Sequence, residues 1–323
     1  MLDVLVEGTR HMTLSLSVVT TLFNSAKTVK EFCERTISVC ERSFGRDFEI
    51  ILVDDGSSDE SVEIARRIAL MDSRIKLIVL SRNFGHHSAI HCGLVQATGN
   101  LVFLIDSDLE EKPEWLEDFL LRLNSGGSDV VYGVQDTRKG KLVERVTGEA
   151  FWRILRFVSG VPMPKNQSTV RLMSRRYLDA LLTFGERSYF FAGVAFETGF
   201  DQEALKIHKA SSPNSTYTLK RKLTLASRAI LGYSQKPLTA VAIMGGLIAG
   251  LSFVIGTYYL VNYIFYGSPL PGWTSLMVSV WFLGGVLLLS VGVIGLYLNQ
   301  VLLESKKRPR YIVKSSFQLN SEN

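Results

Sequence analysis

Two carboxylates separated by one serine follow a short apolar stretch near the middle of the chain. Leu101–Ile105 is apolar throughout, as expected for a strand buried on both faces, and Asp106-Ser107-Asp108 follows it directly. Residues i and i+2 of an extended chain can place both carboxylates within reach of one hard cation. Ligands of open α/β sheets bind outside the carboxyl ends of the strands, so this acidic turn is a predicted metal and ligand site. The alternative is a pair of solvated surface aspartates.

Strand-like and helix-like stretches alternate on both sides of the acidic turn. The expected strands are Leu14–Leu22, Phe48–Val53, Ile75–Leu80 and Asp129–Gly133. The expected helices are Lys27–Arg42, Asp59–Met71, Ser88–Ala97, Pro113–Asn124 and Val143–Ser159. This alternation predicts an α/β fold with a doubly wound, mostly parallel sheet. The chain has no Gly-x-Gly-x-x-Gly after its first strand and no Walker lysine loop, so neither a dinucleotide site nor a P-loop is predicted.

The last third of the chain differs in composition from the rest. Residues Pro237–Leu303 contain no Asp, Glu, Lys or Arg. Two apolar blocks, about 238–265 and 273–303, are each long enough to cross a hydrocarbon core of ~30 Å, and Tyr266–Gly272 between them is a predicted turn. The sequence therefore predicts two transmembrane helices.

Basic residues stand on both flanks of the two apolar blocks. They are Lys220, Arg221, Lys222, Arg228 and Lys236 before the first block, and Lys306, Lys307, Arg308, Arg310 and Lys314 after the second. Positive charge on both flanks predicts a hairpin with both ends on the cytoplasmic side. Apolar residues spaced by three and four further predict an amphipathic helix over 218–236 that lies along the membrane. Basic clusters beside membrane spans are expected in any case, so nucleic acid is not a predicted partner.

The cysteines and histidines predict no disulfide framework and no zinc site. Cys33, Cys40 and Cys92 form no Cys-x-x-Cys pair, which favours reduced thiols in a cytoplasmic domain. His87 and His91 lie four residues apart, but no further metal-ligand motif accompanies them. Residues 1–13 hold no apolar run of signal-peptide length, so we expect the N-terminal domain to stay in the cytoplasm.

Several motifs occur in a fixed order along the chain. They are Val53-Asp54-Asp55-Gly56-Ser57, Ser81-Arg82-Asn83-Phe84-Gly85-His86, Asp106-Ser107-Asp108-Leu109 with Pro113-Glu114, Arg171-Leu172-Met173-Ser174-Arg175, Thr198-Gly199-Phe200, and Pro237-Leu238 before the apolar blocks. With these motifs the chain resembles, over nearly its whole length, the family 2 glycosyltransferases that load a sugar onto a polyprenyl phosphate. That group includes dolichyl-phosphate mannose synthases and bacterial undecaprenyl-phosphate glucosyltransferases.

The resemblance implies a glycosyltransferase A-type fold, a nucleotide-sugar donor and a polyprenyl-phosphate acceptor at the inner membrane. It implies that Asp108 binds Mg²⁺ or Mn²⁺ directly and that Asp106 assists it. The residues expected on the nucleotide sugar are Thr21, Phe23, Asn24, Asp55, Arg82, Asp106 and Ser107, with Asp55 on the base. The implied domains are a catalytic domain at 1–217, the juxtamembrane helix at 218–236, two spans within 237–303 and a basic cytoplasmic tail at 304–323. A homo-oligomer is compatible with this arrangement.

Three departures from the family pattern bear on the donor base and on the acceptor. The chain has Ser25 after Asn24, Thr169 in place of the aspartate proposed as catalytic base in relatives, and Thr216 in place of a lysine. A phosphate monoester with a second pKa of about 6 is largely dianionic at neutral pH, so the acceptor needs positioning more than deprotonation. The residues expected to position its phosphate are Arg171, which is also assigned to catalysis, Arg175 and Lys222.

Three rival interpretations stay open at this point. A processive polysaccharide synthase would carry a Gln-x-x-Arg-Trp motif and more spans, and the chain has neither. A catalytically silent membrane adaptor would keep the fold without the chemistry, and Thr169 favours this alternative, whereas the intact aspartates oppose it. The third is a transferase with a different lipid acceptor.

Overall fold

The structure is a computed structural model of the 323-residue chain, and it describes residues 15–135, 167–185, 191–209, 236–266 and 272–319. In chain order its elements are β1 (Leu16–Leu22), α1 (Val29–Phe44), β2 (Phe48–Asp54), α2 (Ser61–Met71), β3 (Ile75–Leu80), α3 (His86–Gln96), β4 (Leu101–Leu104), α4 (Trp115–Gly126), β5 (Val130–Gln135), β6 (Gln167–Ser174), α6 (Arg175–Leu182), α7 (Phe191–Glu197), β7 (Gln202–Ile207), α9 (Lys236–Tyr266), α10 (Trp273–Ser305) and β8 (Val313–Phe317). The predicted helix over Val143–Ser159 and the interfacial helix over 218–236 lie almost wholly outside the described residues.

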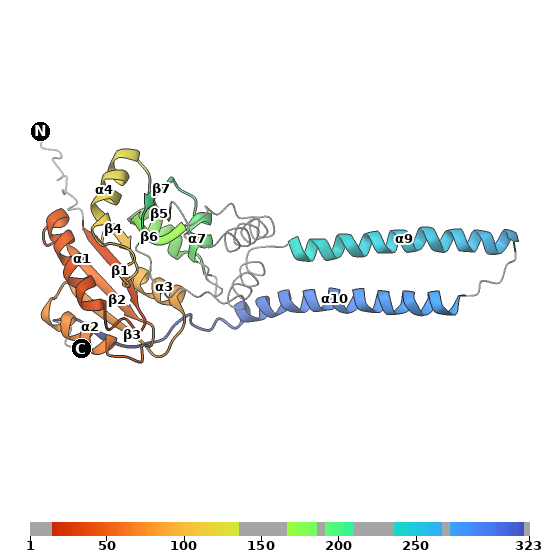
Figure 1. Cartoon of the computed structure of the whole chain (residues 1–323), viewed down its shortest axis with the longest axis horizontal. Coiled ribbons are helices and arrows are strands. Elements are labelled where there is room, and N and C mark those ends of the chain that lie inside the picture. Colours follow the sequence, from red (N-terminus) through yellow and green to blue (C-terminus); the bar gives the residue numbers. More distant parts are fainter. Residues whose placement is uncertain (1–14, 136–166, 186–190, 210–235, 267–271, 320–323) are drawn as a thin grey trace, which may run out of the picture. The chain divides into compact units, whose positions relative to one another are not determined.

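One mixed sheet of eight strands forms the core of the first compact unit, in the order β7-β5-β6-β4-β1-β2-β3-β8 (Figure 1). Strands β1 to β4 run parallel to one another, and β5 and β7 share their direction. Only β6 and β8 run the opposite way among these eight strands. The predicted doubly wound, mostly parallel sheet is therefore confirmed.

The C-terminal residues correct a predicted domain boundary. Residues 304–323 were expected to form a basic tail, but Val313–Phe317 pairs antiparallel with β3 as an edge strand. The backbone N–H of Ser81 donates to the carbonyl of Ile312 at 2.9 Å, and the Arg66 guanidinium lies 4.7 Å from the centre of the Phe317 ring. The chain from Pro309 onward thus belongs to the same compact unit as the sheet. A five-residue edge strand with two serines carries too weak an apolar pattern to be recognised from sequence.

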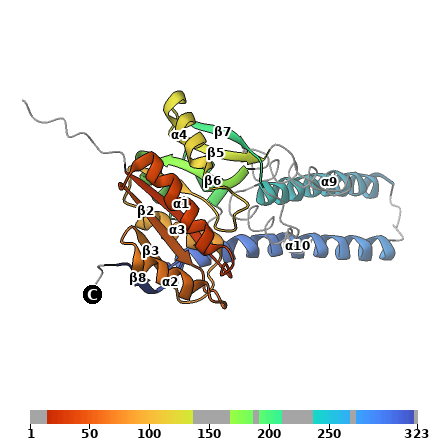
Figure 2. The same cartoon turned by 60° about the vertical axis from the view of Figure 1, so that its left-hand side comes forward.

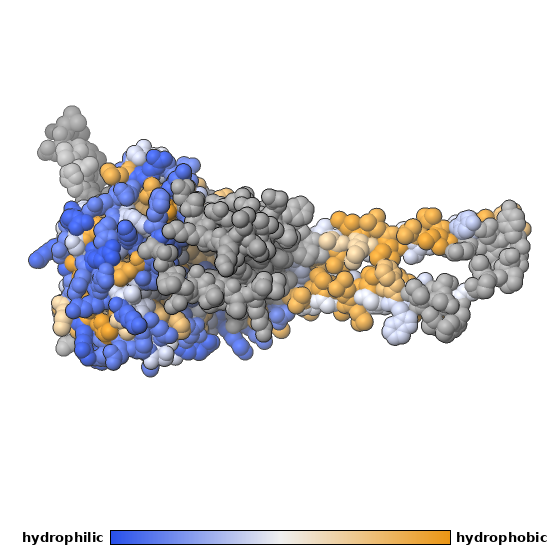
Figure 3. All heavy atoms as spheres, in the orientation of Figure 1, coloured by the Kyte–Doolittle hydropathy of each residue, from blue (hydrophilic) through white to orange (hydrophobic). Residues whose placement is uncertain are grey.

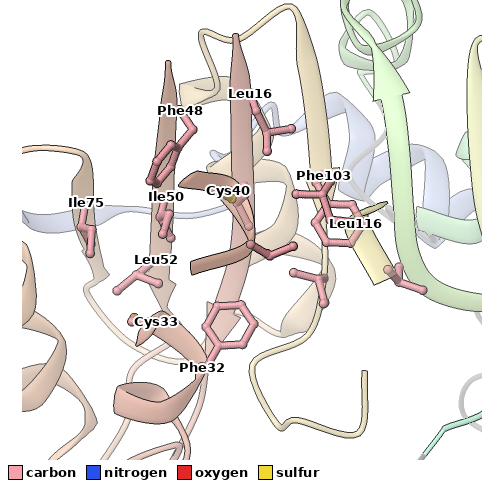
Figure 4. Packing of buried hydrophobic residues seen from close by; sticks show 14 of the residues in the cluster. Leu16, Phe32, Cys33, Cys40, Phe48, Ile50, Leu52, Ile75, Phe103 and Leu116 are labelled. Atoms are coloured by element: carbon pink, nitrogen blue, oxygen red, sulfur yellow. The ribbon is translucent and has the colours of Figure 1, made fainter. Parts of the chain in front are cut away.

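Helices cover both faces of the sheet. Helices α1, α2 and α4 pack with the face that carries Leu16, Ile50 and Phe103, and Figure 4 shows Phe32 and Cys33 of α1 beside these strands. Each buried side chain of this size stabilises the fold by about 1.5–3 kcal/mol. Figure 2 shows the same helices from a second direction.

The opposite face of the sheet is covered by α3. A side chain on Gly93 would collide with Val19 and Val53, so this helix needs a glycine where it crosses β1 and β2. Ala89 is fully buried beside it. Ala89 and Gly93 therefore give this helix a small-residue face, which lets the start of α3 lie close to the strand ends.

Helices α9 and α10 belong to the second compact unit. They contain 31 and 33 residues and lie side by side (Figures 1 and 2). Both are long and apolar enough to cross a membrane by length and composition, and the apolar windows are not buried inside the protein. Figure 3 shows hydrophobic residues along both helices, in contrast to the mixed surface over the sheet. The two predicted apolar helices are therefore present, and only their placement in a membrane stays a proposal.

Candidate active site

The predicted site residues converge on one edge of the sheet, where the parallel strands end. The strand register aligns Thr21 with Val53, and Val53 with Ile78, so the loops after β1, β2 and β3 leave side by side. Leu104 at the end of β4 pairs with Arg171, which brings the start of the antiparallel strand β6 to the same edge. Five segments that are separate in the sequence can therefore contribute to one site.

Hydrogen bonds hold the acidic turn in a fixed shape. The Ser107 hydroxyl donates to the carbonyl of Thr21 at 2.8 Å, and the N–H of Glu110 donates to Asp108 Oδ1 at 3.0 Å. Leu109 has φ +61°, a left-handed conformation that is uncommon for a branched residue. Such backbone conformations cost free energy and cluster at functional sites. The Asp106 side chain is 22% exposed and Asp108 is exposed, so both carboxylates are available to a ligand.

A buried carboxylate that sequence reasoning missed lies behind the turn. Glu111 is fully buried, and its Oε2 accepts a hydrogen bond of 3.1 Å from the N–H of Asp106. Its Oε1 accepts from the Ser168 hydroxyl and lies 2.8 Å from Lys209 Nζ. Glu111 stands in a Glu-Glu-Lys run that is typical of a solvated loop, and Lys209 follows an unpredicted strand. Neither residue carried a sequence signal for burial.

Asp106 has several polar neighbours besides Glu111. His86 Nε2 lies 3.5 Å from Asp106 Oδ1, and His86 Nδ1 lies 3.0 Å from the Thr21 hydroxyl. The Thr169 side chain lowers the pKa of Asp106. Burial first and the Glu111 charge second raise the pKa of Asp106, while Lys209, Asp108 and Thr169 make smaller contributions of mixed sign. Thr169 therefore favours the charged form of Asp106, an effect that the sequence did not reveal.

Asp55 joins the loops after β2 and β3. Its Oδ1 accepts from the N–H of Phe84 at 2.7 Å, and its Oδ2 accepts from the N–H of Gly85 at 2.9 Å. Burial raises the pKa of Asp55, and these two hydrogen bonds oppose that rise. Asp55 is 3% exposed, so its visible role is to fix the loop that carries Arg82 and His86. The expected contact with a nucleotide base stays a prediction.

Exposed side chains surround this fixed framework. Phe23 is 53% exposed and can offer a ring face to a base. Asn24 has φ +54°, and its amide oxygen accepts from the N–H of Ser58 at 3.0 Å, which ties the loop after β1 to the loop after β2. The Arg82 guanidinium lies 4.1 Å from the centre of the Phe84 ring. These contacts bring Phe23, Asn24 and Arg82 to the same edge as Asp106 and Asp108.

Of the three residues predicted for the acceptor phosphate, the structure describes Arg171 and Arg175. Arg171 is 1% exposed and stacks at 4.3 Å on the ring of Phe191, so its side chain is part of the core. Arg175 is wrongly predicted, because its N–H bonds to the carbonyl of Asn100, which precedes β4 at the opposite edge of the sheet. There the guanidinium of Arg175 donates to the carbonyl of Ala97 and forms an ion pair with Asp179. Lys222 lies outside the described residues.

Two carboxylates at the turn fit a hard divalent cation. Among residues that the structure describes, no group of three or more His, Cys, Asp or Glu side chains is arranged to hold a metal. Mg²⁺ binds well through one or two carboxylates when water and substrate phosphates complete its coordination. Asp106 and Asp108 supply that number of oxygen donors on an accessible turn. A metal here would depend on a phosphate-bearing substrate.

The sheet order, the acidic turn after β4 and the loops around it have the layout of an A-type glycosyltransferase. The family model described as glycosyl transferase family 2 matches residues 17–182. The chain belongs to this family.

Several relatives match nearly the whole chain. The uncharacterized glycosyltransferase YkcC of Bacillus subtilis is 33% identical over 316 residues, which cover 97% of each chain. The bactoprenol glucosyl transferase of Shigella phage SfX is 29% identical over 304 residues, which cover 94% of this chain and 99% of the relative. The solved glucosyl-3-phosphoglycerate synthase of Mycobacterium tuberculosis, in complex with Mn²⁺, UDP-glucose and phosphoglyceric acid, is 24% identical with a TM-score of 0.45, covering 67% of this chain and 79% of that one.

Proposed function

We propose that this protein transfers one sugar, with inversion, from a UDP- or GDP-sugar to a polyprenyl phosphate at the cytoplasmic face of the inner membrane. The observation that carries the proposal is the joint presence of an acidic turn at the strand ends and two long apolar helices in one chain. Similarity to a bactoprenol glucosyl transferase over nearly the full length of both chains supports the acceptor class. Asp106 and Asp108 oppose the alternative of a silent adaptor.

The nucleotide sugar would bind across the loops after β1 to β4. Phe23 would stack on the base, and Thr21, Asn24, Arg82 and Ser107 would line the donor site. Asp108, assisted by Asp106, would hold Mg²⁺ or Mn²⁺, which neutralises the charge that develops on the leaving diphosphate. The fixed shape of the turn supports this role, because a preorganised site needs no rearrangement when charge develops.

The acceptor phosphate would react without a carboxylate base. Thr169 stands where relatives carry an aspartate, and its side chain lowers the pKa of Asp106. A phosphate monoester is largely dianionic at pH 7, so its oxygen is already a nucleophile and needs orientation. The chain would therefore bind and orient the phosphate, exclude water and leave proton removal to solvent.

The assay that tests this proposal incubates the full-length protein in detergent with labelled nucleotide sugars and undecaprenyl phosphate. We expect a sugar-phosphate-polyprenol product from one of the nucleotide sugars. If nucleotide sugars are consumed and the lipid stays unmodified, the acceptor class is wrong.

We also propose that α9 and α10 form a membrane hairpin with both ends in the cytoplasm. A cysteine at Ser268, between the two apolar blocks, should then react with an impermeant thiol reagent applied to intact cells. A cysteine at Ser316 in β8 should not react. The native cysteines give little background, because burial raises the pKa values of Cys33 and Cys40 to about 12 and that of Cys92 to about 11. Labelling at Ser316 with protection at Ser268 would reverse the orientation.

A further inference from the structure

A lysine that follows the outermost strand β7 pairs with Glu111, the carboxylate behind the acidic turn. Lys209 follows β7, and its side chain is 18% exposed. Its Nζ lies 2.8 Å from Glu111 Oε1. Burial is the largest single effect and lowers the pKa of Lys209, but Glu111, Asp106 and Asp108 together raise the pKa above its ordinary value. Lys209 is therefore a cation at neutral pH, held beside two carboxylates that face the ligand site.

The position of Lys209 is fixed by contacts from three segments. Glu111 binds the ammonium, and the same carboxylate accepts from Ser168 of β6 and from the N–H of Asp106 after β4. A lysine ammonium has three N–H donors, and Glu111 is the acceptor that it meets among the described residues. Within the described residues the other two N–H bonds meet no acceptor, so they can bind a ligand while Glu111 holds the side chain in place.

The positive charge of Lys209 can attract an anion to a position close to Asp106 and Asp108. A phosphate that approaches this turn is repelled by its negative charge unless a cation lies nearby. Of the residues predicted to supply such a cation, Arg171 is buried, Arg175 lies at the opposite edge, and Lys222 lies outside the described residues. Lys209 is placed where that cation is needed.

We propose that Lys209 binds a substrate phosphate at the acidic turn and that Glu111 is the residue that positions it. The inference rests on the proposed function, since it assigns the phosphate to the donor diphosphate or to the acceptor monoester of that reaction. A plainer explanation is that Lys209 only neutralises the buried Glu111. Removing one partner of such a pair leaves a buried charge without a counter-charge, whereas removing both partners does not. The double variant therefore separates the two explanations.

The experiment compares Lys209→Met, Glu111→Gln and Lys209→Met with Glu111→Gln in the full-length protein in detergent. The control is Lys206→Met, which lies in β7 three residues before Lys209 and has an exposed side chain. For each variant we would measure the melting temperature, the KM values for both substrates and the binding of the nucleoside diphosphate by calorimetry. We expect the double variant to regain the melting temperature that Lys209→Met loses.

The same double variant should keep a substrate affinity at least 10-fold weaker than that of the unmodified protein. Weakened nucleoside diphosphate binding would assign Lys209 to the donor, and a raised KM for polyprenyl phosphate alone would assign it to the acceptor. If the double variant binds both substrates as tightly as Lys206→Met does, Lys209 has no phosphate role. If the unmodified protein transfers nothing to polyprenyl phosphate, the proposed function fails, but calorimetry with UDP and GDP still tests Lys209 directly.

Discussion

Asp108→Asn should lower the rate of sugar transfer by about 10³-fold, since a metal at a leaving group contributes several kcal/mol and each 1.4 kcal/mol is tenfold in rate. The asparagine keeps the size of the side chain and one oxygen, but it loses the charge that attracts a divalent cation. Asp108 is exposed, and its described contact is the hydrogen bond from Glu110, so the fold should be unaffected. The comparison is made by initial rates at saturating Mg²⁺ and Mn²⁺.

Asp118→Asn is the matched control for this variant. Asp118 is an exposed carboxylate in the first turn of α4. It lies on the connection between β4 and β5, as Asp108 does, but outside the acidic turn. Its replacement should leave the rate and the melting temperature nearly unchanged. Near-normal turnover of a folded Asp108→Asn protein in saturating metal would show that Asp108 is not a metal ligand. A large fall in melting temperature would instead assign Asp108 a structural role.

Gly56→Ala should destabilise the protein and weaken nucleotide binding together. Gly56 has φ +72°, and a Cβ there would lie 2.5 Å from the backbone N of Asn83 and 2.6 Å from the backbone carbonyl carbon of Arg82. Backbone atoms cannot swing away as a flexible side chain can, so the loops after β2 and β3 must separate. Left-handed strain of 1–2 kcal/mol and overpacking of 1–3 kcal/mol together lower the free energy of unfolding by about 2–5 kcal/mol.

Gly127→Ala introduces the same left-handed backbone strain as Gly56→Ala but without a steric collision. Gly127 has φ +64°, but a Cβ there would meet no atom within 4 Å. Its replacement should cost only about 1–2 kcal/mol and leave nucleotide binding intact. Denaturant unfolding and calorimetry with the nucleoside diphosphate measure both quantities. Equal costs at the two glycines would mean that the loop contact at Gly56 does not hold the donor site together.

Periodicity predicted the parallel half of the fold well. Ile75–Leu80 and the end of α2 at Met71 agree with the structure, because buried apolar runs alternate with amphipathic helices there. The sequence failed where pairing depends on distant partners. Strand β6 carries Arg171, which looks exposed in the sequence but stacks on Phe191 inside the protein. Strand β8 has little apolar character and is defined by its pairing with β3.

The site was predicted in the same uneven way. Asp106 and Asp108 could be found because they follow a buried strand directly, and strand ends of a parallel sheet gather at one edge. Glu111 and Lys209 could not be found, because their pairing joins residues 98 positions apart in the chain and neither lies in an apolar pattern. Arg175 was misplaced because the direction of β6 was unknown. An antiparallel strand carries its last residue away from the edge where the parallel strands end.

Detection of the glycolipid product tests the central claim most directly. The full-length protein in detergent would be given undecaprenyl phosphate, Mg²⁺ or Mn²⁺ and each of a set of UDP- and GDP-sugars, and the lipid fraction would be analysed by mass spectrometry. The account predicts a lipid heavier by one sugar residue, with a single sugar attached even after long incubation, and none with Asp108→Asn. A lipid that stays unmodified with every donor, or one that carries a growing sugar chain, would contradict it.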